Sequence, residues 1–416
     1  MTGAARVVGV GSGAAGALPD IGALALTLEG AGVPVASRIL VEPDEAVIEQ
    51  ALTPGAPLTV IVAGAAGSEG DLLRRVVARV AGARLVLNDR ALALLEARHQ
   101  RIDRPLSRAA ERQALLPQGA VVWDTASGEP AWAVESAQGI FAVLPRGTEV
   151  RSTIDRDLVP FVQPRWPGLG TTLVRVLRTA GVTAAEIEER LGDRLARPVA
   201  GAPGDASASV VSVEGEVWVR VQARGATAEA VATTLAAAES SLVEVLGADC
   251  YSRDDERLEQ VVGRLLLERR LTLAVAESCT GGLVGDRLTN VAGSSAYFER
   301  GVVAYSNRAK RELLGVAEEV LRTHGAVSAP CAEAMVQSIC ELTGSDCGLA
   351  ITGIVGPDGG TPAKPVGTVF IGVSVGGAVE AQRCRFLGDR RAVKWQSAET
   401  ALDLLRRRLL VLSPRR

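Results

Sequence analysis

A serine and a threonine followed by two glycines come shortly after an apolar run in the second half of the chain. The run, residues 271–276, is typical of a buried strand, and the residues after Gly281 and Gly282 are typical of a helix. At a glycine-opened helix N-terminus, free backbone N–H groups can hold a phosphate or a developing oxyanion. Several hydrolases present a nucleophilic serine in this way. Ser278 is therefore a candidate nucleophile, and helix capping by Ser278 or Thr280 is the alternative.

A lysine stands in a comparable place after the next apolar strand. That strand is expected to end at Tyr305, Asn307 is placed to cap the following helix, and Lys310 lies in the first turn of the helix. Only three of the chain's 45 basic residues are lysines. Because arginine does not lose its proton, a lysine here indicates a need for an ammonium group that can. Chance is the competing explanation.

Seven motifs in one order and spacing resemble the C-terminal domain of the CinA (competence/damage-inducible) family, the nicotinamide-nucleotide amidases. They lie between about Glu256 and Leu410 and comprise residues 276–282, 292–295, 301–310, 324–328, 350–357, 364–369 and 388–390. The resemblance implies hydrolysis of the carboxamide of nicotinamide mononucleotide to nicotinic acid mononucleotide and ammonia, which recycles the nucleotide towards NAD. It implies no metal and no redox cofactor for this reaction.

An amidase needs a nucleophile, a proton acceptor and donors for the oxyanion. Ser278 is the expected nucleophile, and Lys310 is the expected base because neither segment contains a histidine. A neutral lysine requires a pKa far below the ordinary value. Burial, the helix N-terminus and the cationic Arg308 or Arg311 would all lower it. Cys279 is a rival nucleophile, since thiols at helix N-termini are activated.

The resemblance also gives importance to Ser295, Tyr305, Thr352 and an arginine near the last helix, identified as Arg390 with Arg391 as the neighbouring alternative. Tyr305 is predicted to take part in catalysis, and a strand-end tyrosine bonded to the backbone is the simpler interpretation. The predicted substrate contacts are Thr280, Gly281, Gly282, Ser295, Thr352, Gly353, Gly356 and Arg390. Arg390 would clamp the phosphate, which the glycine-rich segment 353–360 would cradle. A helix cap at Ser295 and a tight connection after Thr352 are the alternatives.

Composition limits the class of protein. With 416 residues the chain should hold two or three domains, and because only 3% of residues are aromatic, small aliphatic residues must build their cores. The net charge of −3 argues against nucleic acid as the main partner. Six cysteines without a CxxC pair, and only two histidines, make a zinc site unexpected. The sequence has no apolar run of about 18 residues, so no membrane span is expected. No signal peptide is recognised either, and we expect a cytoplasmic protein.

Two segments with different patterns make up the first part of the chain. Residues 1–165 alternate strands and helices as in an α/β domain, with strands expected at 6–10, 33–41, 58–63, 84–87, 120–123 and 139–144 and helices at 20–29, 44–52, 70–81 and 91–98. The Pro-rich stretch 159–167 marks a boundary. It is followed by a small α+β domain, 166–252, with a hairpin at 207–213 and 216–223 and helices at 184–195 and 227–246.

Residues 253–416 are predicted to form a three-layer α/β domain. Strands are expected at 271–276, 299–305, 348–352, 366–375 and 379–386, and helices at 280–290, 307–314, 330–343 and 390–410. Glycine-rich loops follow several of these strands, and such loops bind ligands in open α/β sheets.

The amino-terminal domain resembles, more weakly, the molybdopterin-binding-like domain of full-length CinA proteins, which can carry ADP-ribose pyrophosphatase activity. Gly13 and Gly70 stand where that family has acidic residues, and Arg146 interrupts its Pro-rich turn. The pyrophosphatase is therefore expected to be weak or lost. Glu69 and Asp71 could still hold a divalent cation, although a solvated loop is favoured.

Two other classes of function stay open. Residues 11–16 fit the GxGxxG pattern, so a Rossmann-type nucleotide-cofactor oxidoreductase is one alternative. A non-catalytic partner of the competence or repair machinery is the other. The middle segment resembles the KH-like domain of the same family but lacks a GXXG between helices, so nucleic-acid binding is not expected. Exposed sites between domains would suit a homodimer, which is the assembly we expect.

Overall fold

The computed structural model describes residues 4–11, 21–146, 150–166, 172–195, 198–213, 216–254 and 256–412. Residues 12–16 of the GxGxxG pattern and residues 147–149 of the altered turn lie outside this part. The chain forms two compact units: residues 1–174 with 197–207 and 222–238, and residues 175–196 with 208–221 and 239–416. The division into three domains stays a prediction.

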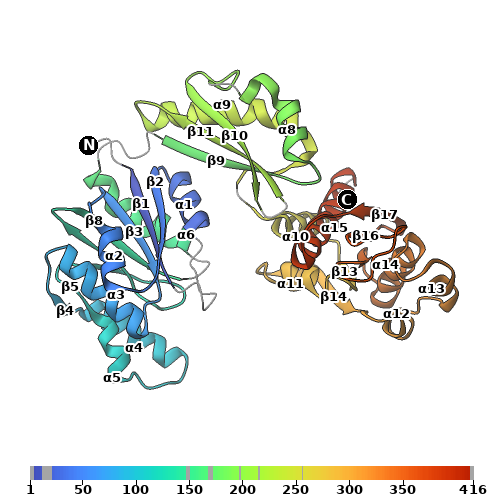
Figure 1. The fold of residues 1–416 in the computed structure, drawn as a ribbon, viewed down its shortest axis with the longest axis horizontal. Coiled ribbons are helices and arrows are strands. Elements are labelled where there is room, and N and C mark those ends of the chain that lie inside the picture. Colours follow the sequence, from blue (N-terminus) through green and yellow to red (C-terminus); the bar gives the residue numbers. More distant parts are fainter. Residues whose placement is uncertain are drawn as a thin grey trace. The chain divides into compact units, whose positions relative to one another are not determined.

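A six-stranded sheet in the order β2-β1-β3-β8-β7-β6 forms the centre of the first unit (Figure 1). Its strands are β1 (Ala5–Val10), β2 (Val35–Val41), β3 (Leu58–Ala63), β6 (Val121–Trp123), β7 (Ala131–Ser136) and β8 (Gly139–Pro145). Strands β2, β1, β3 and β8 are parallel, whereas β7 runs antiparallel to β8 and β6. A separate pair joins β4 (Leu85–Leu87) to β5 (Leu115–Pro117).

Helices cover both faces of this sheet. Successive strand residues point to opposite sides, so the buried strands present an apolar face to each layer of helices. Val8 packs in the core that contains α2 (Glu45–Leu52), α3 (Gly67–Val80) and α4 (Asp89–Arg101). Its neighbour Val7 packs in the other core, which contains α1 (Ile21–Gly30) and the short helix α7 (Val159–Val162). The short helices α5 (Arg108–Glu111) and α6 (Val150–Thr153) complete the set.

In the Pro-rich stretch that was expected to mark a boundary, the described residues 159–166 belong to the first unit. Val162 and Trp166 are buried in the core of the first unit, and Pro160 lies in the first turn of α7. A proline is tolerated there, since the N–H that it lacks would have no partner within the helix.

The middle of the chain forms a four-stranded sheet in the order β10-β11-β9-β12. The predicted hairpin is confirmed as β10 (Asp205–Val213) and β11 (Glu216–Arg224), and the predicted helices as α8 (Ala184–Leu191) and α9 (Ala228–Leu246). Strands β9 (Thr172–Thr179) and β12 (Cys250–Ser252) were not predicted.

One helical stretch, Ala228–Asp249, is long and apolar enough by composition to be considered as a membrane span. Its pattern is that of a core helix instead. Val231, Leu235, Ala238 and Leu242 recur at helical spacing and are almost fully buried, whereas most of the stretch is not buried.

The second unit holds a five-stranded sheet in the order β14-β13-β15-β16-β17 (Figure 1). Its strands are β13 (Leu273–Glu277), β14 (Phe298–Val303), β15 (Cys347–Gly353), β16 (Thr368–Val375) and β17 (Ala378–Arg385). Strand β13 runs parallel to both β14 and β15, and the last two strands are antiparallel to their predecessors. The chain thus passes from β13 to one side and then crosses to the other, which creates a switch point beside β13.

Helices cover both faces of this sheet as well, which confirms the predicted three-layer α/β arrangement. On one face α10 (Leu258–Arg269), α11 (Leu283–Thr289) and α15 (Arg390–Val411) pack against Val275 and Ile351. On the other, α12 (Asn307–Leu314), α13 (Glu318–His324) and α14 (Ala329–Thr343) pack against Ala276 and Ala350.

Element boundaries in this region show two differences from the sequence prediction. The helix expected at 280–290 begins only at Leu283, because the residues before it form a turn. Ser306 rather than Asn307 caps α12, and its hydroxyl accepts a hydrogen bond from Ala309 N at 3.0 Å. Helix α13 was not predicted.

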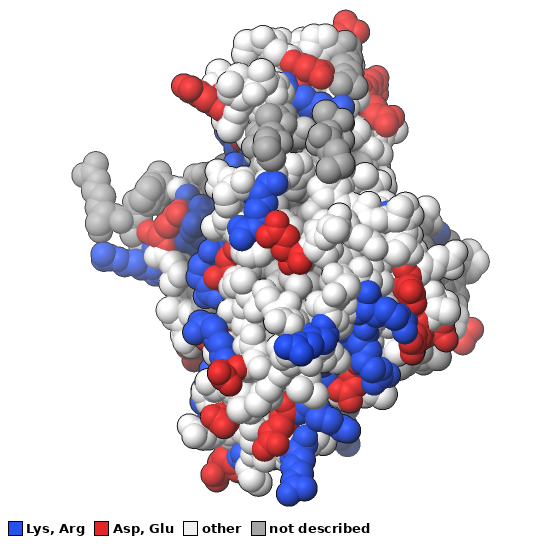
Figure 2. All heavy atoms as spheres, turned by 90° about the vertical axis from the view of Figure 1, so that its left-hand side faces the viewer, with Lys and Arg blue, Asp and Glu red and all other residues white. Residues whose placement is uncertain are grey.

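Basic and acidic side chains are interspersed on the face that Figure 2 shows. Several of the exposed arginines lie in ion pairs, such as Arg79 with Glu45 and Glu49. This mixture on the visible face agrees with the small net charge of the chain.

Candidate active site

Most of the predicted motifs of the second unit gather at one edge of the five-stranded sheet, and the motif that contains Ser295 does not. Parallel strands β13, β14 and β15 all end at this edge, where Glu277 pairs with both Val303 and Ile351. The antiparallel β16 starts here, since Val369 pairs with Gly353, and β17 ends here. The segments that carry Ser278, Lys310, Thr352, Lys364 and Arg390 therefore leave or enter the sheet on the same side.

Lys310 and Ser278 meet inside the protein. Lys310 Nζ lies 2.8 Å from Ser278 Oγ, and only 1% of Lys310 and 7% of Ser278 is exposed. The same nitrogen contacts the backbone oxygens of Ala304, at 2.9 Å, and of Tyr305, at 3.4 Å. Its hydrogen-bond partners are a hydroxyl and two carbonyl groups, so none of them balances a positive charge on the ammonium.

Burial lowers the pKa of Lys310 below the ordinary lysine value. The cationic neighbours expected from the sequence are not the cause. Arg308 pairs with Glu312, and Arg311 pairs with Glu318. Removal from water is the cause because a charged ammonium without a counter-ion is costly in a dry interior.

The three contacts of Lys310 suit a neutral amine. A neutral amine has two hydrogens and one lone pair. The two hydrogens can point to the Ala304 and Tyr305 carbonyl oxygens, which leaves the lone pair to accept the hydroxyl hydrogen of Ser278. This is the arrangement of a base beside the nucleophile that it activates.

Glu277, which the sequence interpretation missed, changes the expected role of the α11 N-terminus. This carboxylate is 1% exposed and accepts hydrogen bonds from Gly282 N at 3.0 Å, Val284 N at 3.2 Å and Gly285 N at 2.9 Å. The backbone N–H groups that were expected to be free for a phosphate or oxyanion are therefore largely occupied. The sequence did contain a signal for this role, because a carboxylate at the end of a fully buried strand needs hydrogen-bond partners.

Thr280 keeps unused hydrogen-bonding groups. It is fully buried, and within the described residues its Oγ1 has no hydrogen-bond partner. No protein acceptor among those residues takes its backbone N–H either, whereas Gly281 N donates to Ser278 O at 3.1 Å. A buried polar group without a partner is costly, so Thr280 is a candidate for a substrate contact.

Cys279 does not have the character of an activated thiol. It is 5% exposed, and burial raises the pKa of its thiol to about 12. A thiol in this environment stays protonated at neutral pH, and the thiolate is the nucleophilic form. Ser278 is therefore the better candidate for the nucleophile.

Tyr305 and Arg390 form a pair at the rim of the site. Tyr305 is 59% exposed, and Arg390 donates to its hydroxyl at 2.9 Å and to Gly356 O at 2.7 Å. The phenol makes no hydrogen bond to Lys310 or Ser278 in the described structure. Its position therefore favours a contact with substrate over the predicted part in catalysis, and Arg390 rather than Arg391 lies beside it.

Of the remaining predicted substrate contacts, Thr352 and Gly353 hold neighbouring segments in place, whereas Ser295 lies far from Ser278. Thr352 Oγ1 donates to Ala326 O at 2.7 Å, and a Cβ on Gly353 would lie 2.7 Å from a Val369 methyl group, so both fix neighbouring segments. Ser295 lies exposed in the turn before β14. The whole of β14, about 20 Å long, separates that turn from the edge where Ser278 lies.

Two glycines of the turn after Ser278 need their residue type. Gly281 and Gly282 have φ angles of +65° and +99°, a region that side chains with a Cβ rarely adopt. A Cβ on Gly281 would also lie 3.6 Å from Lys394 Nζ. Lys394 was not predicted to belong to the site, and the rarity of lysine in this chain was the signal that could have identified it.

The two carboxylates of the amino-terminal domain that were considered for a cation are already engaged. Glu69 Oε1 accepts from Gly64 N at 3.2 Å and pairs with Arg146, while Asp71 pairs with Arg74. These arginines neutralise the charges that would hold a metal. In the described parts of the chain, no group of three or more His, Cys, Asp and Glu side chains is arranged to hold a metal ion.

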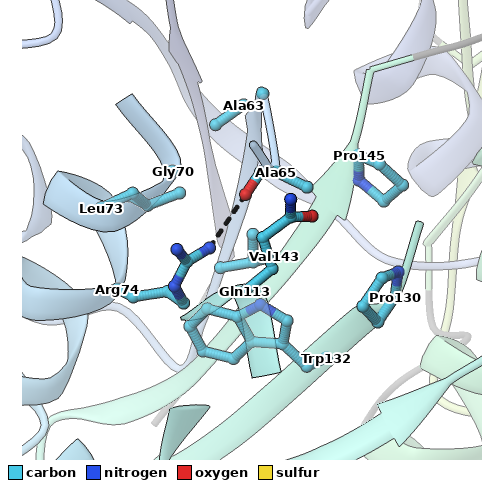
Figure 3. Close-up of a pocket in the computed structure, with 11 residues that line it drawn as sticks. Ala63, Ala65, Gly70, Leu73, Arg74, Gln113, Pro130, Trp132, Val143 and Pro145 are labelled. Carbon is cyan, nitrogen blue, oxygen red and sulfur yellow. Dashed lines mark hydrogen bonds between the residues drawn. The ribbon is translucent and has the colours of Figure 1, made fainter. Parts of the chain in front are cut away.

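The backbone around Gly70 leaves no room for a side chain at this position. Arg74 donates to Ala65 O at 2.9 Å, as Figure 3 shows, in a small pocket with Leu73 and Trp132 among its walls. A Cβ on Gly70 would lie 2.2 Å from that carbonyl oxygen. An acidic side chain therefore does not fit at this position unless the loop moves.

Comparison with known proteins supports the resemblances stated for the C-terminal domain and for the middle segment. Residues 255–409 match the family profile described as CinA C-terminal domain, and residues 174–252 match the damage-inducible protein CinA KH domain. A CinA-like protein of Geobacter sulfurreducens is 40% identical over 93% of this chain and 94% of its own length. A putative competence-damage inducible protein of Moorella thermoacetica is 38% identical over 85% of this chain and 84% of its own length.

Among solved structures, a CinA superfamily protein from Klebsiella pneumoniae shares 38% sequence identity with this chain. The match covers 38% of this chain and 100% of the Klebsiella protein, with a TM-score of 0.37. The relatives from Geobacter and Moorella match over most of their own length, so the similarity is not limited to one domain. The chain belongs to the CinA family.

Proposed function

We propose that this protein hydrolyses the carboxamide of nicotinamide mononucleotide, giving nicotinic acid mononucleotide and ammonia. The observation that carries the proposal is the buried contact of 2.8 Å between Lys310 Nζ and Ser278 Oγ. A buried lysine without a counter-ion has little structural value, because removing it from water costs free energy. The same arrangement is useful to an amidase, which needs a base beside its nucleophile.

The reaction can be followed atom by atom. Neutral Lys310 accepts the Ser278 hydroxyl proton while Oγ attacks the carboxamide carbon, which leaves a negative charge on the carbonyl oxygen. The Thr280 N–H is placed in the turn after the nucleophile, where it can donate to that oxygen. Protonated Lys310 then gives its proton to the amide nitrogen, the C–N bond breaks, and ammonia leaves an ester on Ser278.

Water completes the cycle with the same residues. Lys310 is neutral again after ammonia has left, so it can accept a proton from water while the water oxygen attacks the ester. Ser278 Oγ recovers the proton as it leaves, and nicotinic acid mononucleotide is released. Each proton taken by Lys310 is returned, so neither a redox cofactor nor a metal is required by these steps.

The test is to incubate purified protein with nicotinamide mononucleotide and to measure ammonia and nicotinic acid mononucleotide separately. Equal amounts of the two products are expected, with Ser278→Ala prepared in the same way to control for contaminating amidases. Exhaustive treatment with EDTA should leave the rate unchanged. Failure of the wild-type protein to release ammonia would overturn the proposal.

The alternatives from the sequence receive no support from the comparisons. We also propose that the amino-terminal domain has weak or no ADP-ribose pyrophosphatase activity, because Glu69 and Asp71 are held by arginines. The homodimer and the cytoplasmic location stay predictions.

A further inference from the structure

The three lysines of this chain have an unusual distribution. Lys310 contacts Ser278, and Lys364 Nζ donates at 2.9 Å to His324 O, at the end of α13 and two residues before the Ala326 that accepts from Thr352. Lys394 lies in the second turn of α15, with its ammonium close to Gly281. All other basic side chains of the sequence are arginines, yet the segments around the candidate site contain every lysine.

Lys394 faces the turn that follows the nucleophile. Its Nζ would lie 3.6 Å from a Cβ on Gly281, whereas Gly281 N donates to Ser278 O. Because Gly281 has no side chain, the ammonium can come close to the backbone of this turn. Lys394 also follows Arg390 by four residues, so the two cations lie on the same side of α15.

Neither cation has a carboxylate partner in the described structure. Lys394 makes no hydrogen bond or ion pair with the described residues, and Arg390 donates only to the Gly356 carbonyl and the Tyr305 hydroxyl. The neighbouring acid Asp389 caps the helix by accepting from Ala392 N at 2.8 Å. Like charges four residues apart on a helix repel each other, so a bound anion would stabilise this pair.

The end of the same helix shows the contrast. There Arg406 and Arg407 share Asp403, and Arg407 also pairs with Asp249. The cations of α15 are thus neutralised by acids at its C-terminal end and left without them at its N-terminal end, beside the site. This distribution is expected if a negatively charged ligand neutralises the cations at the N-terminal end.

We propose that Lys394 is a specificity-determining residue that, with Arg390, holds the phosphate of the substrate. The proposal rests on the proposed amidase function. The phosphate monoester is the anionic group of nicotinamide mononucleotide, and the uncharged-sugar analogue nicotinamide riboside lacks it. Lys394 therefore makes the site prefer the nucleotide over the nucleoside, while Ser278 and Lys310 carry out the reaction on either.

The test compares kcat and KM for both substrates in the wild type, Lys394→Gln and Lys394→Arg. Lys394→Gln should lower kcat/KM for the mononucleotide by about tenfold to a hundredfold, mainly through KM, as expected for the loss of a contact to a charged group. Its kcat/KM for the riboside should stay within about twofold of the wild-type value. Lys394→Arg keeps the charge and should recover part of the loss.

Arg391→Gln is the matched control, because it removes one exposed positive charge from the first turn of the same helix, at a residue without a hydrogen bond or ion pair in the described structure. It should leave the preference for the nucleotide unchanged. An equal loss with both substrates in Lys394→Gln would overturn the proposal, and so would an equal loss of preference in Arg391→Gln. Thermal melting of each variant shows whether the fold is intact.

Binding separates this proposal from the proposed function. Calorimetric titration with nicotinic acid mononucleotide needs no turnover, and Lys394→Gln should weaken that binding by a similar factor. If the wild type releases no ammonia but binding still depends on Lys394, the amidase function fails and the phosphate contact stands. If ammonia is released and Lys394→Gln binds the mononucleotide as tightly as the wild type, the phosphate contact fails and the amidase function stands.

Discussion

Lys310 Nζ and Ser278 Oγ lie 2.8 Å apart in the interior of the protein, although 31 residues separate them in the sequence. The contact joins the end of one strand to the helix that follows the neighbouring strand. Neither residue is useful to an amidase without the other, because the serine needs a base and the lysine needs a proton to accept.

Ser278 and Lys310 should therefore behave as one unit. Ser278→Ala, Lys310→Ala and the double variant are expected to fall to a similar low rate of ammonia release, because losses within such a unit are not additive. Lys310→Arg should be nearly as inactive as Lys310→Ala, since arginine stays charged. An active Ser278→Ala together with an inactive Cys279→Ser would assign the nucleophile to the thiol.

The lowered pKa of Lys310 predicts the pH dependence of the reaction. Only the neutral amine is a base, so kcat/KM should rise with pH through the pKa of Lys310 in the folded protein and level off below the ordinary lysine value of 10.5. A pH–rate profile with nicotinamide mononucleotide measures this limb. A rate that falls over the same pH range would show that the protonated lysine is the active form.

The same pKa predicts an effect on stability. Because the pKa of Lys310 is lower in the folded than in the unfolded chain, the unfolded chain binds more protons between the two values. The lysine therefore destabilises the fold fully below its folded-state pKa, and this cost disappears as pH rises to 10.5. At neutral pH, the free energy of unfolding of Lys310→Met should be larger than that of the wild type. The difference should shrink as the pH approaches 10.5. Urea titrations at several pH values measure the difference, and a constant margin would contradict it.

Glu277 should be needed to hold the turn after the nucleophile. Its carboxylate accepts three backbone N–H groups, so Glu277→Ala leaves them without a partner in the interior. We expect a loss of about 2 kcal/mol in the free energy of unfolding and a large fall in activity. Glu299→Ala, at an exposed position of β14, is the control and should change stability by less than about 0.5 kcal/mol. Equal effects of the two variants would show that the anchoring role is wrong.

The C-terminal domain alone, from about Asp254, should keep the amidase activity. All residues of the candidate site lie within it, but the end of α15 loses some of its partners, because Arg406 donates to Ala248 O and Arg407 pairs with Asp249. The fragment should therefore release ammonia at a rate close to that of the full chain and melt at a lower temperature. A folded fragment without activity, beside an active full chain, would contradict this prediction.

The amino-terminal domain should release little or no AMP from ADP-ribose in the presence of magnesium, manganese or cobalt. Gly70→Asp should not restore the activity, because its Cβ would lie 2.2 Å from Ala65 O and the fold would have to shift. Turnover at a rate comparable to the amidase would show that Asp71 and Glu69 exchange their arginine partners for a metal.

Local sequence patterns determined most of the elements that carry the site. The sequence pattern predicted β3 and the strands of the five-stranded sheet, and the helix of Asn307–Leu314 was predicted with its limits. Short elements such as β7 and α13 were missed, since their periodicity is weak and they gain their stability from packing against neighbours.

The sequence by itself also determined which residue types were available for chemistry: a serine after a buried strand, and a lysine in a chain that otherwise uses arginine. The tertiary structure decided which of them meet. It assigned the N–H groups of α11 to Glu277, placed Ser295 at the far end of β14, and brought Lys394 to Gly281. These relationships depend on strand order and register, which join residues distant in the chain, and local propensity carries no information about such contacts.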